Sequence, residues 1–213
     1  MNPTKLLLIS GSQQIPSMSW KLAKHLEQQW SQAHSGIEID TLELARFPEL
    51  LSHYGPDSVK DADLFKSKDN LLARLYESDA IVVIAPEWGG MLPPALTNLF
   101  LLSAYGSANG FPLAHKPALA IGLSASGGGA NPITLLRAYA GKNSHLCWLP
   151  NHAVVQNVER FLSSPWTPRQ NDRVSKVQAR LDIGFSTLLI YAQQLRPVRE
   201  QLSASLISQP YGQ

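Results

Sequence analysis

Residues 80–98 read AIVVIAPEWGGMLPPALTN, and this stretch decides the fold class. Its first six residues carry no polar side chain, which is typical of a strand that is buried on both faces. The glycines at positions 89–90 predict a turn, and Pro94 suits the first position of a helix that continues to Ala104. A buried strand that leads through a short turn into a helix indicates a parallel α/β fold.

The same order of strand and helix extends upstream. Lys5–Ser10 is a nearly continuous apolar run that predicts the first strand, and a helix follows it to about His34. Ile37–Leu42 alternates and predicts the second strand, Arg46–Pro56 predicts a loop, and Ala62–Glu77 predicts a helix.

Downstream, Pro117–Leu123 predicts a fourth strand and Leu146–Leu149 predicts the beginning of a fifth. A long final helix carries one apolar stripe at helical spacing, formed by Val174, Val177, Leu181, Phe185, Leu188, Ala192 and Leu195. Strands that alternate with helices in this way indicate a doubly wound α/β fold, with helices on both faces of one parallel sheet.

Five strands favour the flavodoxin-like order 2-1-3-4-5. In that order a ligand crevice opens at the carboxyl ends of strands 1 and 3, and the loops at residues 11–19 and 86–98 follow those two strands. We predict a single flavodoxin-like domain over residues 1–200, with residues 201–213 as a frayed C-terminal tail.

The composition fits one domain with a sizeable core. The 213 residues are 44% hydrophobic and 16% charged, which argues against disorder. No apolar stretch reaches the ~20 residues that span a bilayer, and no segment of signal-peptide length precedes the first strand. We therefore expect a soluble cytoplasmic protein without a membrane partner.

Charge is distributed unevenly, although the net charge is only +2. Residues 36–102 carry 11 acidic and 5 basic side chains, whereas residues 103–213 carry 4 acidic and 10 basic ones. The basic excess, which includes Arg160 and Arg173, is either a solvated helix face, the interpretation that we favour, or a surface that attracts an anionic ligand such as a dinucleotide. No aromatic residues interleave with the basic ones, so no nucleic-acid partner is expected.

No catalytic residue and no metal site are predicted. Cys147 lies in an apolar stretch and is expected to be an inert core thiol. The six histidines lack ligand spacing, and His145 and His152 are expected to be capping or surface groups. Ser12 does not lie in a Gly-x-Ser-x-Gly turn, so a serine triad cannot be argued.

The loop at residues 11–19, GSQQIPSMS, is rich in hydroxyl groups and opens a helix. Backbone N–H groups at the start of a helix, together with serine hydroxyls, suit an anion such as phosphate. Ser17 and Ser19 could equally serve as helix caps alone. The loop therefore predicts a phosphate site, with a purely structural alternative for its serines.

Three motifs, each after a predicted strand, resemble the NAD(P)H-dependent FMN reductase family. The first is Gly-Ser with a second Ser five residues later and then Leu-Ala, found here within residues 11–23. The second is Pro-Glu-aromatic, a Gly-rich turn and Pro-x-x-Leu-x-Asn, found within residues 86–98. The third is Ser-x-Ser-Gly with further glycines at residues 124–129, followed by Leu136-Arg137.

The resemblance covers roughly residues 5–160 and implies a flavodoxin-like oxidoreductase that uses FMN and NAD(P)H. The first loop would grip the FMN phosphate, the second would lie along the isoalloxazine ring, and the third would approach the ring from the next strand. The implied cofactor-binding residues are Gly11, Ser12, Gln14, Ser17, Met18, Ser19, Pro86, Glu87, Trp88, Gly89, Gly90, Ser124, Ser126, Gly127 and Gly128.

The implied reaction passes hydride through FMN to a small-molecule electron acceptor, such as a flavin or a quinone. Hydride transfer to flavin requires no acid–base residue, because the cofactor carries the chemistry. Trp88, Met91 and the connection Ala104–Gly110 are expected to form an apolar wall over the exposed flavin face. Trp88 could instead be a core or subunit-interface aromatic residue.

Two positions support an alternative, a flavodoxin-like binding or regulatory module that has lost tight flavin binding. Gln14 stands where many members of the family carry Arg or Lys, so one charge-assisted phosphate contact would be missing. Gly89 replaces a residue with an amide side chain and is expected to loosen its turn.

Self-association is expected from one predicted helix. Leu99, Phe100, Leu101 and Leu102 exceed what a single helix face can bury against a sheet. The resemblance implies association through the same helix. We therefore expect a homodimer or a homotetramer.

Overall fold

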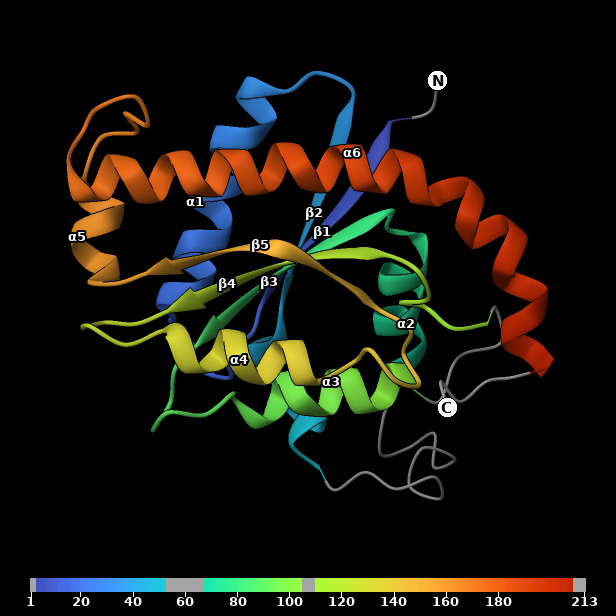
Figure 1. Cartoon of the computed structure of the whole chain (residues 1–213). Helices are drawn as coiled ribbons and strands as arrows, with labels where there is room; N and C mark the ends of the chain where they lie inside the picture. Colours follow the sequence, from blue (N-terminus) through green and yellow to red (C-terminus); the bar gives the residue numbers. More distant parts are fainter. Residues whose placement is uncertain (1–2, 53–66, 105–109, 209–213) are drawn as a thin grey trace.

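The computed structural model describes residues 3–52, 67–104 and 110–208, with side chains as far as residue 202. Within these ranges the strands are β1 (Thr4–Ser10), β2 (Ile37–Glu43), β3 (Ala80–Pro86), β4 (Pro117–Leu123) and β5 (Cys147–Val155). All neighbouring strands are parallel and their order is β2-β1-β3-β4-β5, which confirms the predicted flavodoxin-like sheet (Figure 1).

The α-helices are α1 (Met18–Ala33), α2 (Lys68–Glu77), α3 (Pro94–Ala104), α4 (Ala130–Ala138), α5 (Val158–Ser163) and α6 (Arg173–Ser208). Two short 3₁₀ turns, η1 (Leu44–Arg46) and η2 (Pro48–Leu51), occupy part of the segment that was expected to be a loop. The predicted helix start at Ala62 lies outside the described residues. None of the described helices is apolar over a stretch long enough to cross a membrane.

Helices cover both faces of the sheet, as Figure 1 shows. Leu7 and Ile9 of β1 face the core shared with α2, α3 and α4. Leu6 and Leu8 face the opposite core, shared with α1, α5 and α6. Every residue of β3 and β4 is buried, as expected for central strands that lack polar positions.

α6 runs along the whole sheet and packs closely on α1. The Trp30 ring stacks on the Phe185 ring with centroids 4.0 Å apart, and its indole N–H donates to the Asp182 carboxylate at 3.2 Å. Pro197 lies inside the helix and removes one backbone donor, and α6 bends near its C-terminal end (Figure 1). α6 continues to Ser208, so the boundary expected at residue 200 falls within a helix.

α3 buries most of the side chains that were expected to be exposed. Leu99, Phe100 and Leu102 are 0%, 5% and 1% exposed, and only Leu101 is open to solvent, at 37%. Leu50 of η2 belongs to the same core, and the Asn98 amide donates to its carbonyl at 2.5 Å. The argument that α3 presents an apolar surface for self-association is therefore wrong.

Candidate functional site

The loops that follow β1, β3 and β4 meet at the carboxyl edge of the sheet, beside the switch point between β1 and β3. Together with the first residue of α5 they enclose a cavity of about 230 Å³. The first loop contributes Ser12, Gln14 and residues 16–19, the second contributes residues 86–88, and the third contributes residues 123–125. The predicted meeting of these loops is confirmed.

Gly11 allows the first loop to leave β1 close to β3. Its N–H donates to the Ile84 carbonyl at 2.9 Å, and a Cβ at this position would lie only 2.8 Å from the same oxygen. Any side chain would therefore push the loop away from β3. Gly11 shapes the site without lining the cavity.

Three buried serines, connected by their hydroxyl groups, link the end of β1 to the start of α1. Ser17 is the N-cap residue, and its hydroxyl oxygen accepts from the Trp20 N–H at 3.2 Å. Ser10 donates to the Ser19 hydroxyl at 3.0 Å, and the Ser19 and Ser17 hydroxyls lie 3.3 Å apart. Ser17 is thus a helix cap that also lines the cavity. Ser19 lines it as well, but is only 1% exposed and contacts the Ser17 hydroxyl.

The first loop fits an anion. In the described part of the chain the N–H groups of Met18 and Ser19 have no hydrogen-bond acceptor, as expected for the first residues of a helix. The first turn of α1 contains no acidic residue. Ser12 accepts from the Gln14 N–H at 3.1 Å, and its hydroxyl hydrogen remains available. Free N–H groups at the positive end of a helix, with adjacent hydroxyls, suit a phosphate group.

Two glutamines connect the first loop to its surroundings. The Gln13 side-chain oxygen accepts from the Ala95 N–H, in the first turn of α3, at 3.3 Å. Gln14 is exposed and lines the cavity. No lysine or arginine is among the described lining residues, so the phosphate would rest on neutral donors and the helix dipole.

Gly89 and Gly90 form a closed hairpin turn with φ values of +57° and +79°. Trp88 and Met91 exchange two backbone hydrogen bonds across it, of 3.1 and 2.9 Å. Two consecutive positive φ angles define the tight turn that glycine adopts without strain. The turn that Gly89 was expected to loosen is closed by both hydrogen bonds in the structure. Trp88 is half-buried and lines the cavity, whereas Met91 is 64% exposed and does not.

Glu87 joins the second loop to the third. Its carboxylate accepts a short hydrogen bond from the Gly129 N–H, and its own N–H donates to the Leu123 carbonyl at 2.9 Å. A Cβ on Gly128 would lie 3.0 Å from the Glu87 carboxylate oxygen. The sequence suggested backbone donors at Glu87, but the structure assigns its side chain to holding the third loop.

The turn between β5 and α5 closes the site from the side. The Val158 N–H donates to the Ser124 carbonyl at 3.2 Å, and the Asn157 N–H donates to the Ser126 carbonyl at 3.0 Å. Ser124 in turn accepts the Ser126 N–H on its hydroxyl oxygen at 3.1 Å. Val158 therefore lines the cavity from a segment that carries no recognisable motif.

The structure gathers part of the predicted set around the cavity: Ser12, Gln14, Ser17, Met18, Ser19, Pro86, Glu87, Trp88 and Ser124. Other predicted residues belong to the loops but do not line it: Gly11, Gly89, Gly90, Ser126, Gly127 and Gly128. The lining residues that sequence reasoning missed are Pro16, Leu123, Ala125 and Val158. They are apolar neighbours of the motif residues, or, for Val158, a contact from a distant segment.

Burial raises the pKa of the Cys147 thiol, which makes it a poor nucleophile. Among the described residues, no group of three or more His, Cys, Asp and Glu side chains could hold a metal ion.

Comparisons with known proteins identify a family and several relatives of the chain. The sequence profile of the family described as NADPH-dependent FMN reductase matches residues 4–159. An FMN-dependent NADH:quinone oxidoreductase of Pectobacterium atrosepticum is 33% identical over 98 residues, which cover 41% of this chain and 49% of the relative. A protein of the same description from Yersinia pestis is 30% identical over 105 residues, covering 45% and 52%. The chain thus spans about half the length of these curated relatives.

Solved structures share the fold at low sequence identity. RosB with a bound 8-demethyl-8-formylriboflavin-5′-phosphate has a TM-score of 0.70 and 15% identity, over 97% of this chain and 85% of that one. An NADH:FMN oxidoreductase in its apo form has a TM-score of 0.63 and 16% identity, over 87% and 90%. The NAD(P)H:acceptor oxidoreductase FerB of Paracoccus denitrificans has a TM-score of 0.56 and 20% identity, over 89% and 96%.

Proposed function

Since the chain belongs to the NADPH-dependent FMN reductase family, we propose that it is an NAD(P)H-dependent oxidoreductase that works through bound FMN. The observation that carries the proposal is the cavity at the carboxyl edge, where a phosphate-type loop meets an aromatic second loop. Bound FMN would accept hydride from NAD(P)H and deliver it to a small acceptor. The protein would supply position and electrostatics, so no catalytic acid or base is assigned.

The lining residues form a polar part of the site for the phosphate of FMN and an apolar part for its ring. Ser12, Ser17 and the free N–H groups at the start of α1 would hold the phosphate. Pro86, Trp88 and the apolar side chains opposite them would contact the ring and exclude water from one of its faces. A cavity of about 230 Å³ is smaller than the ~300 Å³ at which pockets begin to enclose whole ligands, so part of the cofactor would remain open to reactants.

A quinone is the acceptor that the curated relatives favour, because they are described as NADH:quinone oxidoreductases. Trp88 is half-buried at the cavity and offers a flat apolar surface to a planar acceptor. Met91, at 64% exposed, lies at the end of the same hairpin. The rest of the expected wall, residues 105–109, lies outside the described residues.

The test begins with the protein as purified from cells supplied with riboflavin. We expect a yellow protein that releases FMN on denaturation and oxidises NADH or NADPH in the presence of a naphthoquinone. If nicotinamide and quinone use one face in turn, double-reciprocal plots will be parallel. A colourless protein that fails to bind added FMN would instead support the alternative of a regulatory module without flavin.

We also propose that the protein acts in the cytoplasm, where NAD(P)H is supplied, and that it forms a homo-oligomer. An exposed apolar pair on α6 supports self-association, because Ile183 and Ile190 are 61% and 60% exposed and lie two helical turns apart. Sedimentation at micromolar concentration tests the second point. A monomer for the wild type would contradict it, and loss of association in Ile183→Glu would place the contact on α6.

A further inference from the structure

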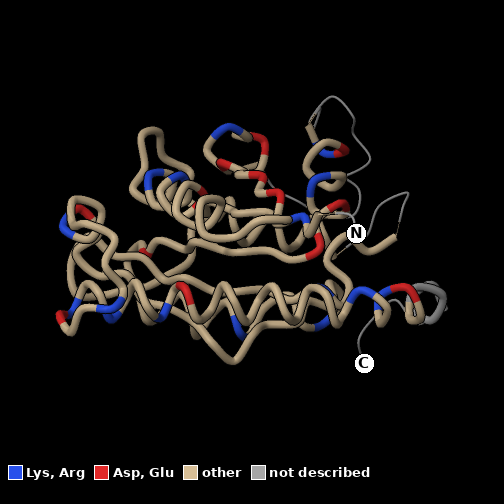
Figure 2. Tube along the Cα trace, turned by 90° about the horizontal axis from the view of Figure 1, so that it is seen from above, with Lys and Arg blue, Asp and Glu red and all other residues tan. Residues whose placement is uncertain are grey.

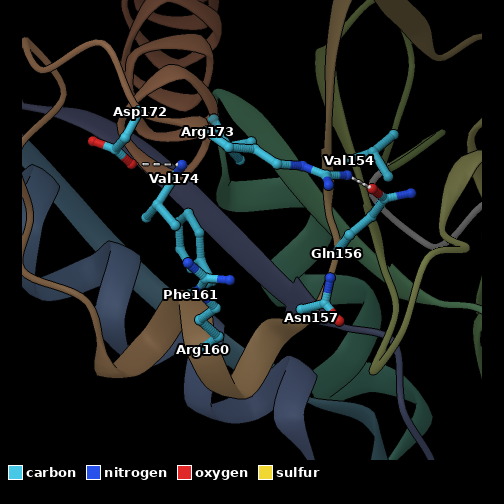
Figure 3. Close-up of a pocket in the computed structure, with 9 residues that line it drawn as sticks. Val154, Gln156, Asn157, Arg160, Phe161, Asp172, Arg173 and Val174 are labelled. Atoms are coloured by element: carbon cyan, nitrogen blue, oxygen red, sulfur yellow. Dashed lines mark hydrogen bonds between the residues drawn. The ribbon is translucent and has the colours of Figure 1, made fainter.

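A second cavity, of about 240 Å³, lies beside the proposed flavin site. It is formed by the end of β5, by α5 and by the start of α6 (Figure 3). Phe161 and Val174 give it an apolar wall, and Arg160 and Arg173 bring positive charge to it. None of the three motifs includes these residues.

The third loop and the turn before α5 both lie next to the two cavities. Gln156 lines the second cavity, and its amide N–H group donates to the Gly128 carbonyl at 3.1 Å and, more closely, to that of Gly127. Asn157 lines it as well, and the next residue, Val158, lines the flavin cavity. A ligand in the second cavity would therefore lie directly behind the loop that borders the cofactor.

The two arginines of this cavity are not neutralised by any acidic side chain that the structure describes. Arg173 donates a short hydrogen bond to the side-chain oxygen of Gln156, a neutral group, as Figure 3 shows. Within the described residues, no acidic side chain forms an ion pair with Arg160 or Arg173. Charge-assisted hydrogen bonds from both guanidinium groups thus remain available to an anion.

Asp172 is the one acidic residue among those lining the cavity, and its carboxylate serves α6. It accepts from the Val174 N–H at 2.8 Å, from the Ser175 N–H at 3.1 Å, and from the Ser175 hydroxyl. These hydrogen bonds, first of all those from Ser175, lower the pKa of Asp172. Its charge is thus directed at the start of the helix, and the arginines leave the cavity net positive.

We propose, resting on the proposed function, that this cavity binds a phosphate group of the nicotinamide dinucleotide that supplies the hydride. A dinucleotide carries its phosphates away from the reacting ring, so it needs an anion site near the flavin but separate from the FMN phosphate. The cavity meets both conditions, because it adjoins the third loop and is lined by neither the first loop nor α1. A quinone acceptor has no phosphate and would not use it.

The surrounding charge supports the same ligand. Arg173, Lys176 and Arg180 follow one another on one side of α6, and Figure 2 shows several basic segments at the end of the molecule where α5 and the start of α6 lie. Lys176 and Arg180 line a neighbouring open groove of about 540 Å³ between β5 and α6. That groove includes no residue of the three loops, so we assign the phosphate to the cavity beside the third loop.

The test compares Arg160→Ala, Arg173→Ala and their double variant with Arg169→Ala. Arg169 is an exposed arginine in the same segment that does not line the cavity, so its variant matches the change in charge. The KM for NADPH and for NADH is measured on FMN-loaded protein with a quinone acceptor. We expect the double variant to raise the KM at least about tenfold, with an unchanged rate from the phosphate-free donor N-benzyl-1,4-dihydronicotinamide.

Binding of adenosine 2′,5′-bisphosphate and of ADP, measured by calorimetry, gives a readout that does not depend on turnover. If the double variant weakens only adenosine 2′,5′-bisphosphate and NADPH, the cavity binds the 2′-phosphate. If it also weakens ADP and NADH, the cavity binds the diphosphate. KM and binding constants within twofold of those of Arg169→Ala would overturn the inference. Failure of the wild-type protein to oxidise the phosphate-free donor would instead contradict the proposed function, and the calorimetry would still test the cavity.

Discussion

The two ends of the sheet both collect polar groups, yet they use them differently. At the amino end the Asp79 carboxylate accepts from the Lys5 N–H at 3.0 Å, from Arg196 at 2.6 Å and from Arg199 at 2.9 Å. At the carboxyl end the N–H groups at the start of α1 and the Ser12 hydroxyl face a cavity. Polar groups that are satisfied within the chain hold the fold together, and those left facing a cavity are available to a ligand.

Lys116 shows how far the amino end relies on internal partners. It is 4% exposed, and its ammonium group donates to the Tyr76 carbonyl at 2.6 Å and, more closely, to the Leu75 carbonyl, at the end of α2. Burial, and to a smaller extent nearby Arg199, lowers the pKa of Lys116 to about 7, with Asp79 and Glu77 opposing the shift. Lys116 thus caps the C-terminal end of α2, and it lies at the end of the sheet opposite the proposed ligands.

Among the substitutions, the largest loss of stability is expected from Asp79→Ala, which removes the acceptor shared by Arg196 and Arg199. Both arginines would lose their partner against the sheet edge, so we expect a loss of about 3 kcal/mol in unfolding free energy, measured by urea denaturation. Asp40→Ala breaks the exposed pair with Arg74 and should cost less than about 1 kcal/mol. If Asp79→Ala also weakened FMN binding in the folded protein, the two ends would not be independent.

Gly122→Ala tests the packing of the carboxyl end. A Cβ on Gly122 would lie 1.9 Å from the Gly129 carbonyl oxygen, so the third loop must move. We expect a loss of about 2–3 kcal/mol in stability, together with weaker FMN binding. Gly127→Ala is the matched control, because a Cβ there meets nothing within 4 Å, and it should change stability by less than about 0.5 kcal/mol. Equal effects in the two variants would contradict the close approach.

Ser12→Ala combined with Ser17→Ala removes two hydroxyls from the proposed phosphate site. We expect FMN affinity to fall at least about tenfold, at about 1–2 kcal/mol for each lost contact, as measured by quenching of flavin fluorescence. Because Ser17 also caps α1, stability should fall by about 1 kcal/mol. An unchanged FMN affinity would show that the serines act only as helix caps.

Lys116 should make stability depend on pH. Below pH 7 both the folded and the unfolded chain hold the proton, so the cost of burying the charge is present in full. Between pH 7 and pH 10.5 the unfolded chain binds more protons, so stability rises with pH, by at most about 1.4 kcal/mol per unit. Urea denaturation at several pH values checks this, and Lys116→Met should lack that part of the rise. A wild-type profile parallel to that of the variant would mean that the pKa is not lowered.

The smallest effect is expected from Trp88→Ala. If Trp88 contacts the acceptor more than the cofactor, the KM for a quinone should rise severalfold while the dissociation constant for FMN changes less. Steady-state kinetics and FMN titration on the same preparation separate the two. If the dissociation constant for FMN rises by a larger factor than the KM for the quinone, Trp88 contacts mainly the cofactor.

Regular apolar patterns allowed the central fold to be predicted from the sequence. The runs of β1, β3 and β4 have no competing interpretation, and the two loops that follow β1 and β3 must meet in a 2-1-3-4-5 sheet. β5 begins at Cys147, within the stretch Leu146–Leu149 that was predicted to begin it, and continues to Val155. Pro150 interrupts its pattern, and a proline is tolerated there because β5 is an edge strand with an irregular register beside β4.

The remaining errors concern contacts between distant segments. Nothing near Leu99 or Phe100 in the sequence reveals that η2 and its neighbours cover α3. The same holds for Val158, which reaches the flavin cavity only because the turn before α5 binds Ser124. Glu87 was assigned through its backbone, since sequence cannot tell which way a carboxylate points.

The position of α6 has a consequence for synthesis of the chain. All five strands and all three motifs precede α6, yet Leu181, Phe185 and Leu188 cover one face of the sheet. While the protein is being made, the part of that face beneath α6 stays exposed to water until residues 181–192 have left the ribosomal exit tunnel. We expect ribosome-bound chains arrested before Arg173 to be sensitive to protease and to bind no FMN, so the cofactor would be acquired only after α6 has been made. Protease-resistant arrested chains would show that the sheet forms without its last helix.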